Sequence, residues 1–555
     1  MKKGSDVDFK IIGVILIFAL SLAVNLYFCF QKAGFHEDEY YTYFSSNRTM
    51  GLYQPDREWQ DRQTVLDEFV VKPGERFNYG LVKLVQSWDV HPPFYYYIFH
   101  TICSFFPMEF TKWSGLIANL IAFVLAFYLL SRILQIMDLP YYLRLSILGL
   151  WGMNPQTVSS TIFIRMYSWL TVFIFLCALI HIAMIVRISR ESWTVNYYSN
   201  LITGKFDSRV IGKLNGPRFA VFYLLPLMVT SFLGFLTQYF YLFFFVPVGF
   251  IFTIWLIFWK YDGKKAVYYV ISCVISMAAA VLVYPASLHH LFGGYRGNEA
   301  ASSLLDIGNT FMRIGFFSGL LNDFVFSGIL IFIAPVILIL AVVFFIKGRA
   351  NPRKRRLEDN DGCPELIITA LAVIAYFLLT SKAALLVGSA SNRYEMPIYG
   401  LAIMVIMVLL DKYLVKLNEY ITIAIIPLLA IAILLKGYLF DGNVLFQYRE
   451  DIEKIDYANR NRDQVAVVMY NPASPHNVWR LTDEIIEYAE VYYMDEENLQ
   501  IITDEKVIGA EKIILYVADD EHQETAVENM MLSAKMTDKT HKFSEDMWNT
   551  YELSR

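Results

Sequence analysis

Residues 219–259 read FAVFYLLPLMVTSFLGFLTQYFYLFFFVPVGFIFTIWLIFW, a stretch of 41 residues without a charged side chain. A helix needs about 20 apolar residues to cross roughly 30 Å of hydrocarbon. This stretch therefore predicts two membrane-spanning helices with a turn near Thr237 and Gln238. The rest of the 555-residue chain agrees, because 56% of it is hydrophobic and only 18% is charged. An average soluble domain has about 45–50% and 25%, so the composition argues against a soluble globular protein.

Nine further apolar runs predict spans, which makes eleven in all; eight of the nine are charge-free, and 366–387 contains Lys382 near its outer end. They are 11–31, 113–131, 145–164, 166–186, 266–284, 324–346, 366–387, 396–410 and 421–435. The first run is too long for a signal-peptide core and lacks a small-residue cleavage site, so we expect it to stay as an anchor. The five cysteines have no CxxC spacing and predict neither a disulfide framework nor a zinc site.

The apolar run 94–106 decides which side every later loop faces, and at 13 residues it is short for a span. If it lies flat on the outer surface, the inner segments hold 22 Lys and Arg residues and the short outer segments hold 4. These inner segments are 1–10, 132–144, 187–218, 260–265, 347–356 and 412–416. The positive-inside rule favours this arrangement. We therefore predict a multi-pass protein with a cytoplasmic N-terminus, an external C-terminal tail and an interfacial helix over 93–107.

Charge divides the chain into a transmembrane domain, 1–439, and an external domain, 440–555. Residues from Phe440 onward carry a balance of −14, and the residues before it carry +9. The first external loop, 32–112, is assigned to the transmembrane domain. In the tail, 464–470, 491–493 and 512–518 predict strands, and 480–489 and 524–534 predict helices, so we expect a small α/β domain. The basic residues form short clusters between apolar runs, which predicts no nucleic-acid surface.

The first loop carries two groups that could do chemistry. Asp38 and Glu39 follow the first span closely, in the sequence His36-Glu37-Asp38-Glu39, where carboxylates could take a proton or hold a cation. Ordinary surface charge on a solvated loop explains them equally well. His91 precedes Pro92 and Pro93, which favour a helix start, and a helix N-terminus attracts anions. A helix-start signal with an aromatic belt is the alternative there.

Cationic side chains gather in the predicted outer turns. Arg165 interrupts the apolar stretch 145–186, and Arg393 with Tyr394 occupies a later outer turn. Lys382, His289, His290 and Arg296 are placed on the same side. Each could be an interface anchor, but their shared side suggests a functional set. The basic residues from Lys347 to Arg356 are explained by membrane orientation.

These pieces, in this order, resemble the polytopic C-type glycosyltransferases that use polyprenyl-phosphate sugars. This family includes protein O-mannosyltransferases, the lipid A aminoarabinose transferase and many bacterial relatives. The matching points cover residues 10–400. They are the acidic pair Asp38-Glu39, HPPFYYYIFH at 91–100, RMYSW at 165–169, QYF at 238–240 and NRYEMP at 392–397.

The resemblance implies a mainly α-helical polytopic membrane fold and transfer of a sugar, with inversion, from a polyprenyl-phosphate carrier on the outer face of a bacterial plasma membrane. The acceptor could be a glycan, a lipid or a protein. Asp38 would be the catalytic carboxylate, supported by Glu39. His91, Arg165 and Arg393 would hold the lipid phosphate, and Tyr167, Gln238 and Tyr394 would complete the substrate site.

The chain departs from the family where relatives often carry an acidic residue near the second outer turn. Here Ile162, Phe163 and Ile164 precede Arg165, so a metal bridged by two loops is not expected, and dependence on a divalent cation stays open. A transporter or lipid flippase is the main rival. It would show charged or broken helices near mid-membrane and often internal repeats. A non-catalytic receptor or assembly factor whose acidic tail binds partners is a second rival.

Overall fold

The computed structural model describes residues 3–47, 55–189, 216–350, 363–498 and 502–555. Its internal contacts divide the chain into two units. The membrane unit comprises Met1–Cys29, Gln86–Tyr95 and Gly115–Leu445, and the sheet unit comprises Phe30–Val85, Tyr96–Ser114 and Phe446–Arg555. This division differs from the predicted one, because most of the first loop, assigned above to the transmembrane domain, clusters with the tail.

Ten helical segments among the described residues are long and apolar enough to span a membrane. They are α1 (Lys3–Gln31), α6 (Lys112–Ile136), α9 (Tyr167–Ser189), α10 (Gly216–Phe219) continuing through η2 (Ala220–Leu224) into α11 (Leu225–Thr237), α12 (Tyr241–Phe258), α13 (Gly263–Val283), α17 (Leu330–Ala350), α19 (Pro364–Ala383), η6 (Met396–Ile398) with α20 (Tyr399–Leu414), and α21 (Glu419–Leu439). The two spans predicted within 219–259 are confirmed, with the turn at Gln238 between α11 and α12.

The remaining predicted span, 145–164, forms two short helices instead of one long helix. α7 (Tyr141–Gly152) ends before Met153, and α8 (Pro155–Ile162) begins two residues later. Asn154 separates them: its side-chain oxygen accepts a hydrogen bond from Gln156 N–H at 3.0 Å, and Pro155 has no N–H to continue α7. The composition of the run does not reveal this break, because Asn and Pro are uncharged.

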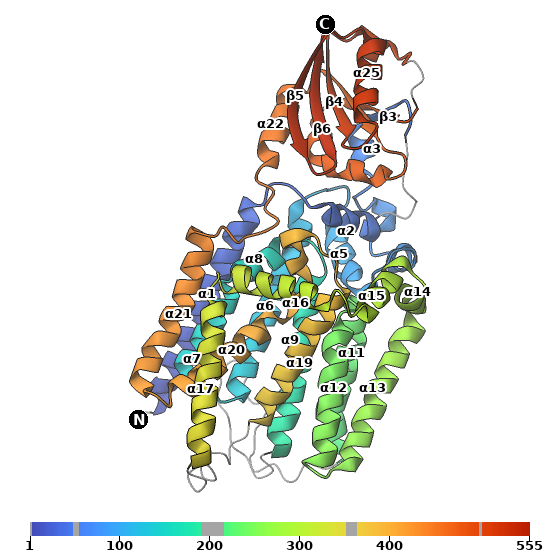
Figure 1. The fold of residues 1–555 in the computed structure, drawn as a ribbon. Coiled ribbons are helices and arrows are strands. Elements are labelled where there is room, and N and C mark those ends of the chain that lie inside the picture. Colours follow the sequence, from blue (N-terminus) through green and yellow to red (C-terminus); the bar gives the residue numbers. More distant parts are fainter. Residues whose placement is uncertain (1–2, 48–54, 190–215, 351–362, 499–501) are drawn as a thin grey trace. The chain divides into compact units, whose positions relative to one another are not determined.

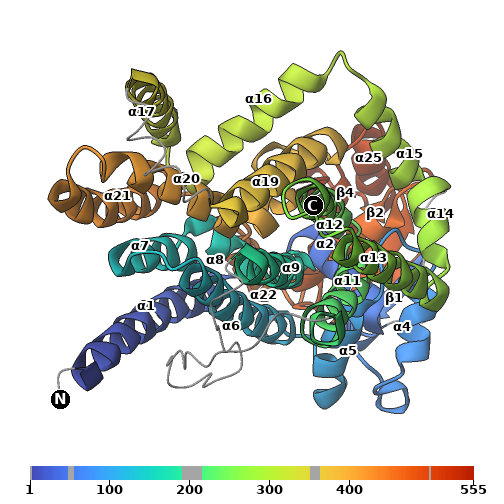
Figure 2. The same cartoon turned by 90° about the horizontal axis from the view of Figure 1, so that it is seen from below.

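The spans of the membrane unit run side by side, and α14 (Ala286–Phe292), α15 (Tyr295–Leu305) and α16 (Thr310–Leu320) lie across them near one end (Figure 1). Seen along the spans, α9 occupies the middle of the bundle, where it contacts α11, α12 and α19 (Figure 2). The helix ends that flank the six predicted inner segments meet at the opposite end from α16 (Figure 1). The basic residues Arg353–Arg356 lie outside the described residues.

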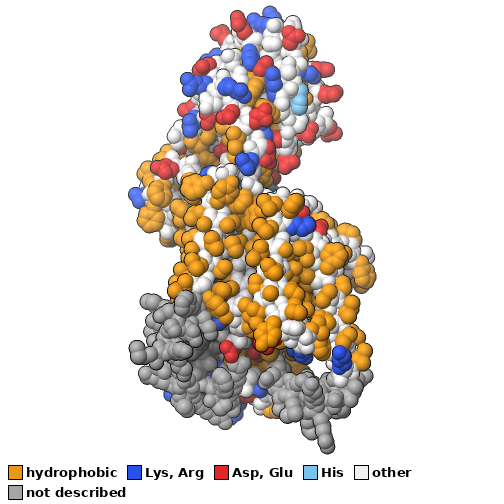
Figure 3. Space-filling model, turned by 90° about the vertical axis from the view of Figure 1, so that its left-hand side faces the viewer, with side chains coloured by type: hydrophobic (Ala, Val, Ile, Leu, Met, Phe, Trp, Pro, Cys, Tyr) orange, Lys and Arg blue, Asp and Glu red, His pale blue; other side chains and the backbone are white. Residues whose placement is uncertain are grey.

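Apolar side chains cover the outside of the long helices. On the face seen in Figure 3, hydrophobic side chains form a broad field over the membrane unit. Exposed apolar side chains on the spanning helices as a whole include Ile15 on α1, Phe250 on α12, Leu282 on α13 and Phe332 on α17. Soluble monomers rarely expose so large an apolar surface. Helices that contact the hydrocarbon chains of a bilayer carry such a surface on their outside.

The sheet unit is built on six strands in the order β1-β3-β2-β4-β6-β5. The strands are β1 (Glu58–Asp61), β2 (Val465–Tyr470), β3 (Glu490–Asp495), β4 (Lys512–Ala518), β5 (Asp538–Glu545) and β6 (Trp548–Ser554). β3, β2 and β4 are parallel, whereas β1, β6 and β5 pair antiparallel. The strands predicted in the tail correspond to β2, β3 and β4.

The sheet unit also contains short helices, some of which cover the two faces of the sheet. Those that follow the first span are α2 (Glu37–Asn47), α3 (Arg62–Leu66), η1 (Pro73–Glu75), α4 (Tyr79–Gln86) and α5 (Phe94–Phe105); those in the tail are α22 (Asp451–Arg460), η7 (Pro475–Leu481), α23 (Thr482–Ile485), α24 (Glu505–Gly509) and α25 (Gln523–Ala534). α24 and α25 pack on one face. α22, η7 and α23 pack on the other. The predicted helix 480–489 is only the short α23 following η7. The helix predicted over 93–107 is present as α5, and its interfacial position stays a prediction.

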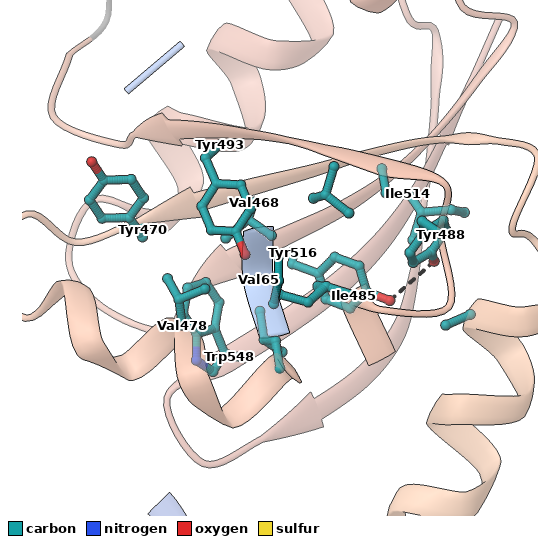
Figure 4. Packing of buried hydrophobic residues seen from close by; sticks show 14 of the residues in the cluster. Val65, Val468, Tyr470, Val478, Ile485, Tyr488, Tyr493, Ile514, Tyr516 and Trp548 are labelled. Atoms are coloured by element: carbon teal, nitrogen blue, oxygen red, sulfur yellow. Dashed lines mark hydrogen bonds between the residues drawn. The ribbon is translucent and has the colours of Figure 1, made fainter. Parts of the chain in front are cut away.

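The first loop completes the core of the sheet unit. β1 pairs with β3 from Glu58 opposite Tyr493 to Asp61 opposite Glu490. Val65 of α3 enters the same buried cluster as Val468, Tyr488 and Tyr516 of the tail (Figure 4). Burial of a Val side chain stabilises a fold by about 1.5–3 kcal/mol, so β1 and α3 are part of this unit's core.

Candidate functional site

The predicted site residues belong to both units. Asp38 and Glu39 lie in the sheet unit, whereas His91, Arg165, Tyr167, Gln238, Arg393 and Tyr394 lie in the membrane unit. The two groups of side chains are therefore described separately.

Arg165 lies in the turn between α8 and α9 and is only 4% exposed. Asn119 of α6 fixes this turn, because its side-chain amide donates to the carbonyls of Thr161 and Phe163 at 3.2 and 2.6 Å. The Arg165 guanidinium reaches His91, with 3.4 Å between Nη2 and Nε2. The structure therefore brings together two predicted phosphate ligands that are 74 residues apart.

His91 has a second partner that the sequence did not single out. Its Nδ1 lies 3.1 Å from Oδ2 of Asp89. Burial by itself raises the pKa of Asp89, but the charge and hydrogen bond of His91 and the charge of Arg165 outweigh burial, so the net shift of this pKa is downward. Asp89 is therefore ionised at neutral pH. The His91 ring lies between the Asp89 carboxylate and the Arg165 guanidinium. The only signal in the sequence was its place two residues before His91.

Arg393 lies against aromatic rings. Its guanidinium lies 5.1 Å from the ring centre of Tyr394 and 5.9 Å from that of Phe163, and Nη2 donates to the Tyr394 hydroxyl at 3.2 Å. The Tyr394 ring also contacts Tyr167 and Phe240, with centroids 5.9 and 5.7 Å away. Cation–π contacts of this kind hold an arginine in a fixed orientation. Arg393, Tyr394 and Tyr167 thus share one cluster beside the Arg165 turn.

The NRYEMP turn is anchored by two buried tyrosines. Tyr376 donates from its hydroxyl to the carbonyl of Tyr394 at 2.9 Å, and Tyr399 donates to Oδ1 of Asn392 at 2.6 Å. Glu395 in the same turn is fully buried, and neither of its carboxylate oxygens has a hydrogen-bond partner among the described residues. Burial raises the pKa of Glu395 well above its usual value, because no positive charge or donor from the described residues offsets the cost of burying the carboxylate.

Gln238 ends α11 and is buried, and its side-chain oxygen accepts a hydrogen bond from Phe240 N–H at 3.4 Å within the same turn. The next residue makes the longer-range contact. Tyr239 donates to Nδ1 of His290 at 2.9 Å, and Nε2 of His290 lies 3.4 Å from the carbonyl oxygen of Ser87. Gln238 therefore shapes its turn, and Tyr239 connects that turn to the segment that carries Asp89 and His91.

The other predicted cations have local partners. Lys382 donates to the carbonyl of Asp306, to Asn309 and to Thr310, so it holds the connection between α15 and α16. Arg296 pairs with Glu299 at 3.0 Å on an exposed surface. Both contacts explain these residues without a ligand.

In the sheet unit, the two carboxylates of the acidic pair have opposite surroundings. Glu39 is fully buried and its Oε2 lies 2.9 Å from Nζ of Lys32, which also donates to the carbonyl of Phe446. Asp38 lies in the first turn of α2, with its side chain 28% exposed and Oδ2 3.7 Å from Nδ1 of His36. Asp38 is thus the accessible carboxylate, and Glu39 is a structural one.

The backbone before α2 is held against the start of the tail. Ala33 N–H donates to the carbonyl of Gln447 at 2.8 Å. A Cβ at Gly34 would lie 2.0 Å from Oδ2 of Asp451, whose carboxylate pairs with Arg480 at 2.8 Å. Only glycine allows this close approach. The tail therefore fixes the position of α2 and of Asp38 within the sheet unit.

A divalent cation would find few ligands at the acidic pair. Lys32 already neutralises Glu39, so a cation there would depend on Asp38 and on oxygens of water or substrate. Among the residues that the structure describes, no group of three or more His, Cys, Asp or Glu side chains is placed to hold a metal ion.

The fold and these groups define a multi-pass membrane protein with an α/β sheet unit. No protein-family model matches the chain, and no curated protein matches it. Among solved structures, the chain is similar to ArnT from Cupriavidus metallidurans bound to undecaprenyl phosphate, with 10% identity, 97% coverage of both chains and a TM-score of 0.47. It is also similar to apo ArnT from the same organism, with 10% identity, coverage of 92% of this chain and 96% of that chain, and a TM-score of 0.44.

Proposed function

We propose that this protein is a membrane glycosyltransferase that moves a sugar from a polyprenyl-phosphate carrier to an acceptor at the outer face of the plasma membrane. The observation that carries the proposal is the gathering of two buried arginines, Arg165 and Arg393, around Phe163, Tyr167 and Tyr394 in the membrane unit, with the imidazole of His91 beside Arg165. Buried charge in a membrane protein is costly and is retained where it binds something.

A lipid phosphate suits these groups chemically. A phosphate monoester carries up to two negative charges and offers oxygens to planar guanidinium donors, which bind phosphate well. The aromatic rings keep the guanidinium of Arg393 oriented, so binding costs little further ordering. Tyr167 and Tyr394 then line the place of the sugar or the first isoprene units.

The reaction breaks the bond between the anomeric carbon and the phosphate oxygen. An acceptor hydroxyl attacks that carbon from the opposite side, which inverts its configuration, and the hydroxyl proton goes to the carboxylate of Asp38. The electron pair of the broken bond stays on the lipid phosphate, and the fixed cations stabilise it there. Glu39 does not exchange protons in this scheme and supports α2 through Lys32.

The test is a transfer assay on the purified full-length chain in detergent. Undecaprenyl-phosphate sugars of several kinds are supplied with cell-envelope glycans, lipids or peptides, with and without Mg²⁺, and released undecaprenyl phosphate and product are measured. Transfer of one of the sugars supports the proposal. Movement of lipid-linked sugar across liposomes without any release of undecaprenyl phosphate would instead identify a transporter or flippase.

A further inference from the structure

One ionised carboxylate in the membrane unit, that of Asp89, has no part in the proposed reaction. It lies behind His91, on the side of the imidazole ring opposite to Arg165: Oδ2 of Asp89 faces Nδ1 at 3.1 Å, and Nη2 of Arg165 faces Nε2 at 3.4 Å. A ring nitrogen that faces a carboxylate carries the proton, which leaves Nε2 as the atom directed at the arginine.

The segment that carries Asp89 is held at a second point. The carbonyl oxygen of Ser87 lies 3.4 Å from Nε2 of His290 on α14, and Nδ1 of His290 accepts from the buried Tyr239 hydroxyl at 2.9 Å. The segment before α5, the QYF turn and α14 therefore meet around one carboxylate. The charged and titratable groups that face His91 and Asp89 here are Arg165, Tyr239, His289 and His290.

We propose that Asp89 is a positioning residue of the lipid-phosphate site, which orients His91 so that Nε2 and the Arg165 guanidinium bind the same phosphate group. The inference rests on the proposed function for the identity of the ligand. Second partners of this kind fix the orientation and tautomer of a functional histidine elsewhere in proteins. When His91 carries a proton on both ring nitrogens, Nε2 can donate to a phosphate oxygen while Nδ1 donates to Asp89.

The experiment is a double-mutant cycle on phosphate binding by the full-length protein in detergent. Asp89→Asn, His91→Ala, the double variant and Asp89→Glu are compared for binding of undecaprenyl phosphate, with undecaprenol as the phosphate-free probe. Glu299→Gln, which removes a carboxylate from an exposed ion pair in the same unit, is the control. Thermal unfolding of each variant confirms that it is folded.

We expect Asp89→Asn to weaken binding of undecaprenyl phosphate about 5- to 20-fold and the double variant to bind within about 2-fold of His91→Ala, because Asp89 acts through His91. Asp89→Glu should stay within about 3-fold of the wild type, and acceptor KM should not change. The inference would be overturned if the loss of affinity in the double variant equalled the product of the losses in the two single variants. Unchanged affinity in Asp89→Asn would also overturn it.

The same measurements separate this inference from the proposed function. Selective binding of undecaprenyl phosphate with a non-additive cycle, but no sugar transfer, would leave the positioning role standing and remove the enzymatic proposal. A wild-type protein that binds undecaprenol and undecaprenyl phosphate equally would overturn the positioning role itself.

Discussion

Asp38 and Glu39 are adjacent in the chain, yet one carboxylate is partly open to solvent and the other is sealed against Lys32. The sequence marked both as a pair, because an acidic pair after the first span was its only visible property. Burial separates their roles. The acidic pattern therefore pointed to both residues, and the packing of α2 leaves only the carboxylate of Asp38 partly open to solvent.

The buried pair gives the first prediction. Glu39→Gln keeps a hydrogen-bond acceptor but leaves the Lys32 ammonium buried without its counter-charge, a change that typically costs about 3–5 kcal/mol. We expect a markedly lower thermal unfolding temperature in purified protein. Glu37→Gln is the control, since Glu37 is partly exposed and lies 3.9 Å from His476. Equal stability of Glu39→Gln and the wild type would mean that the ion pair does not hold α2.

The two arginines give the second prediction. Arg165→Ala and Arg393→Ala should each raise the KM for the lipid donor at least ~10-fold, because a charge-assisted phosphate contact contributes more than about 1.4 kcal/mol. Arg296→Ala, which removes an exposed arginine paired with Glu299, is the matched control. Donor kinetics that stay normal in both purified variants would take these residues out of the site.

The candidate phosphate-binding arginines could be picked out from the sequence, but the residues that contact the rest of the site could not. Arg165 and Arg393 stand out as charges in apolar surroundings, and in the structure the ring of Phe163 lies next to both the Arg393 guanidinium and the Tyr167 ring. Asp89 and Tyr239 were missed because their contacts join segments far apart in the chain, which no local pattern encodes. Whether these residues bind a donor stays a prediction.

At the scale of elements, β1 shows what a local pattern leaves out. Its four residues, Glu58–Asp61, have no alternating apolar run and gain their strand conformation from pairing with β3. β5 was missed because it is a polar, largely exposed strand at the edge of the sheet. The buried parallel strands β2, β3 and β4 were predictable because they are nearly continuous apolar runs.

The register of β1 gives the third prediction. Asp61 lies opposite Glu490, so cysteines placed at both positions should form a disulfide readily under mild oxidation. Glu58→Cys with Glu490→Cys is the control pair, because it is three residues out of register, or roughly 10 Å along the strand. Peptide mapping by mass spectrometry reads the result. Equal cross-linking of both pairs would show that β1 does not hold this register.

At the scale of the whole molecule, the fold class was predictable because a helix that crosses the bilayer must consist of about 20 mainly apolar residues. The structure confirms ten of the eleven predicted runs as candidate spans, and the exception is the run broken at Asn154 and Pro155. The division between units was not predictable, because the charge change at Phe440 marks only where the tail begins. The contribution of the first loop to the sheet depends on long-range pairing.

The positive-inside rule gives the fourth prediction. Cys363 is exposed at the start of α19, at the end of the membrane unit that we place in the cytoplasm, so a membrane-impermeant thiol reagent should label it only after cells are permeabilised. Ser544→Cys on β5, in a Cys363→Ser background, should be labelled in intact cells. The reverse pattern would invert the topology and move the sheet unit inside.

The transfer assay with Asp38→Asn tests the proposed chemistry most directly. Asn keeps the size of the side chain and removes its charge and basicity, so we expect an abundant, folded protein whose turnover at saturating donor falls at least ~100-fold, the lower range for loss of a general base. Glu37→Gln, a neighbouring carboxylate on the same helix, should keep near-native turnover. Near-native turnover in Asp38→Asn would contradict the mechanism and require another group to accept the proton.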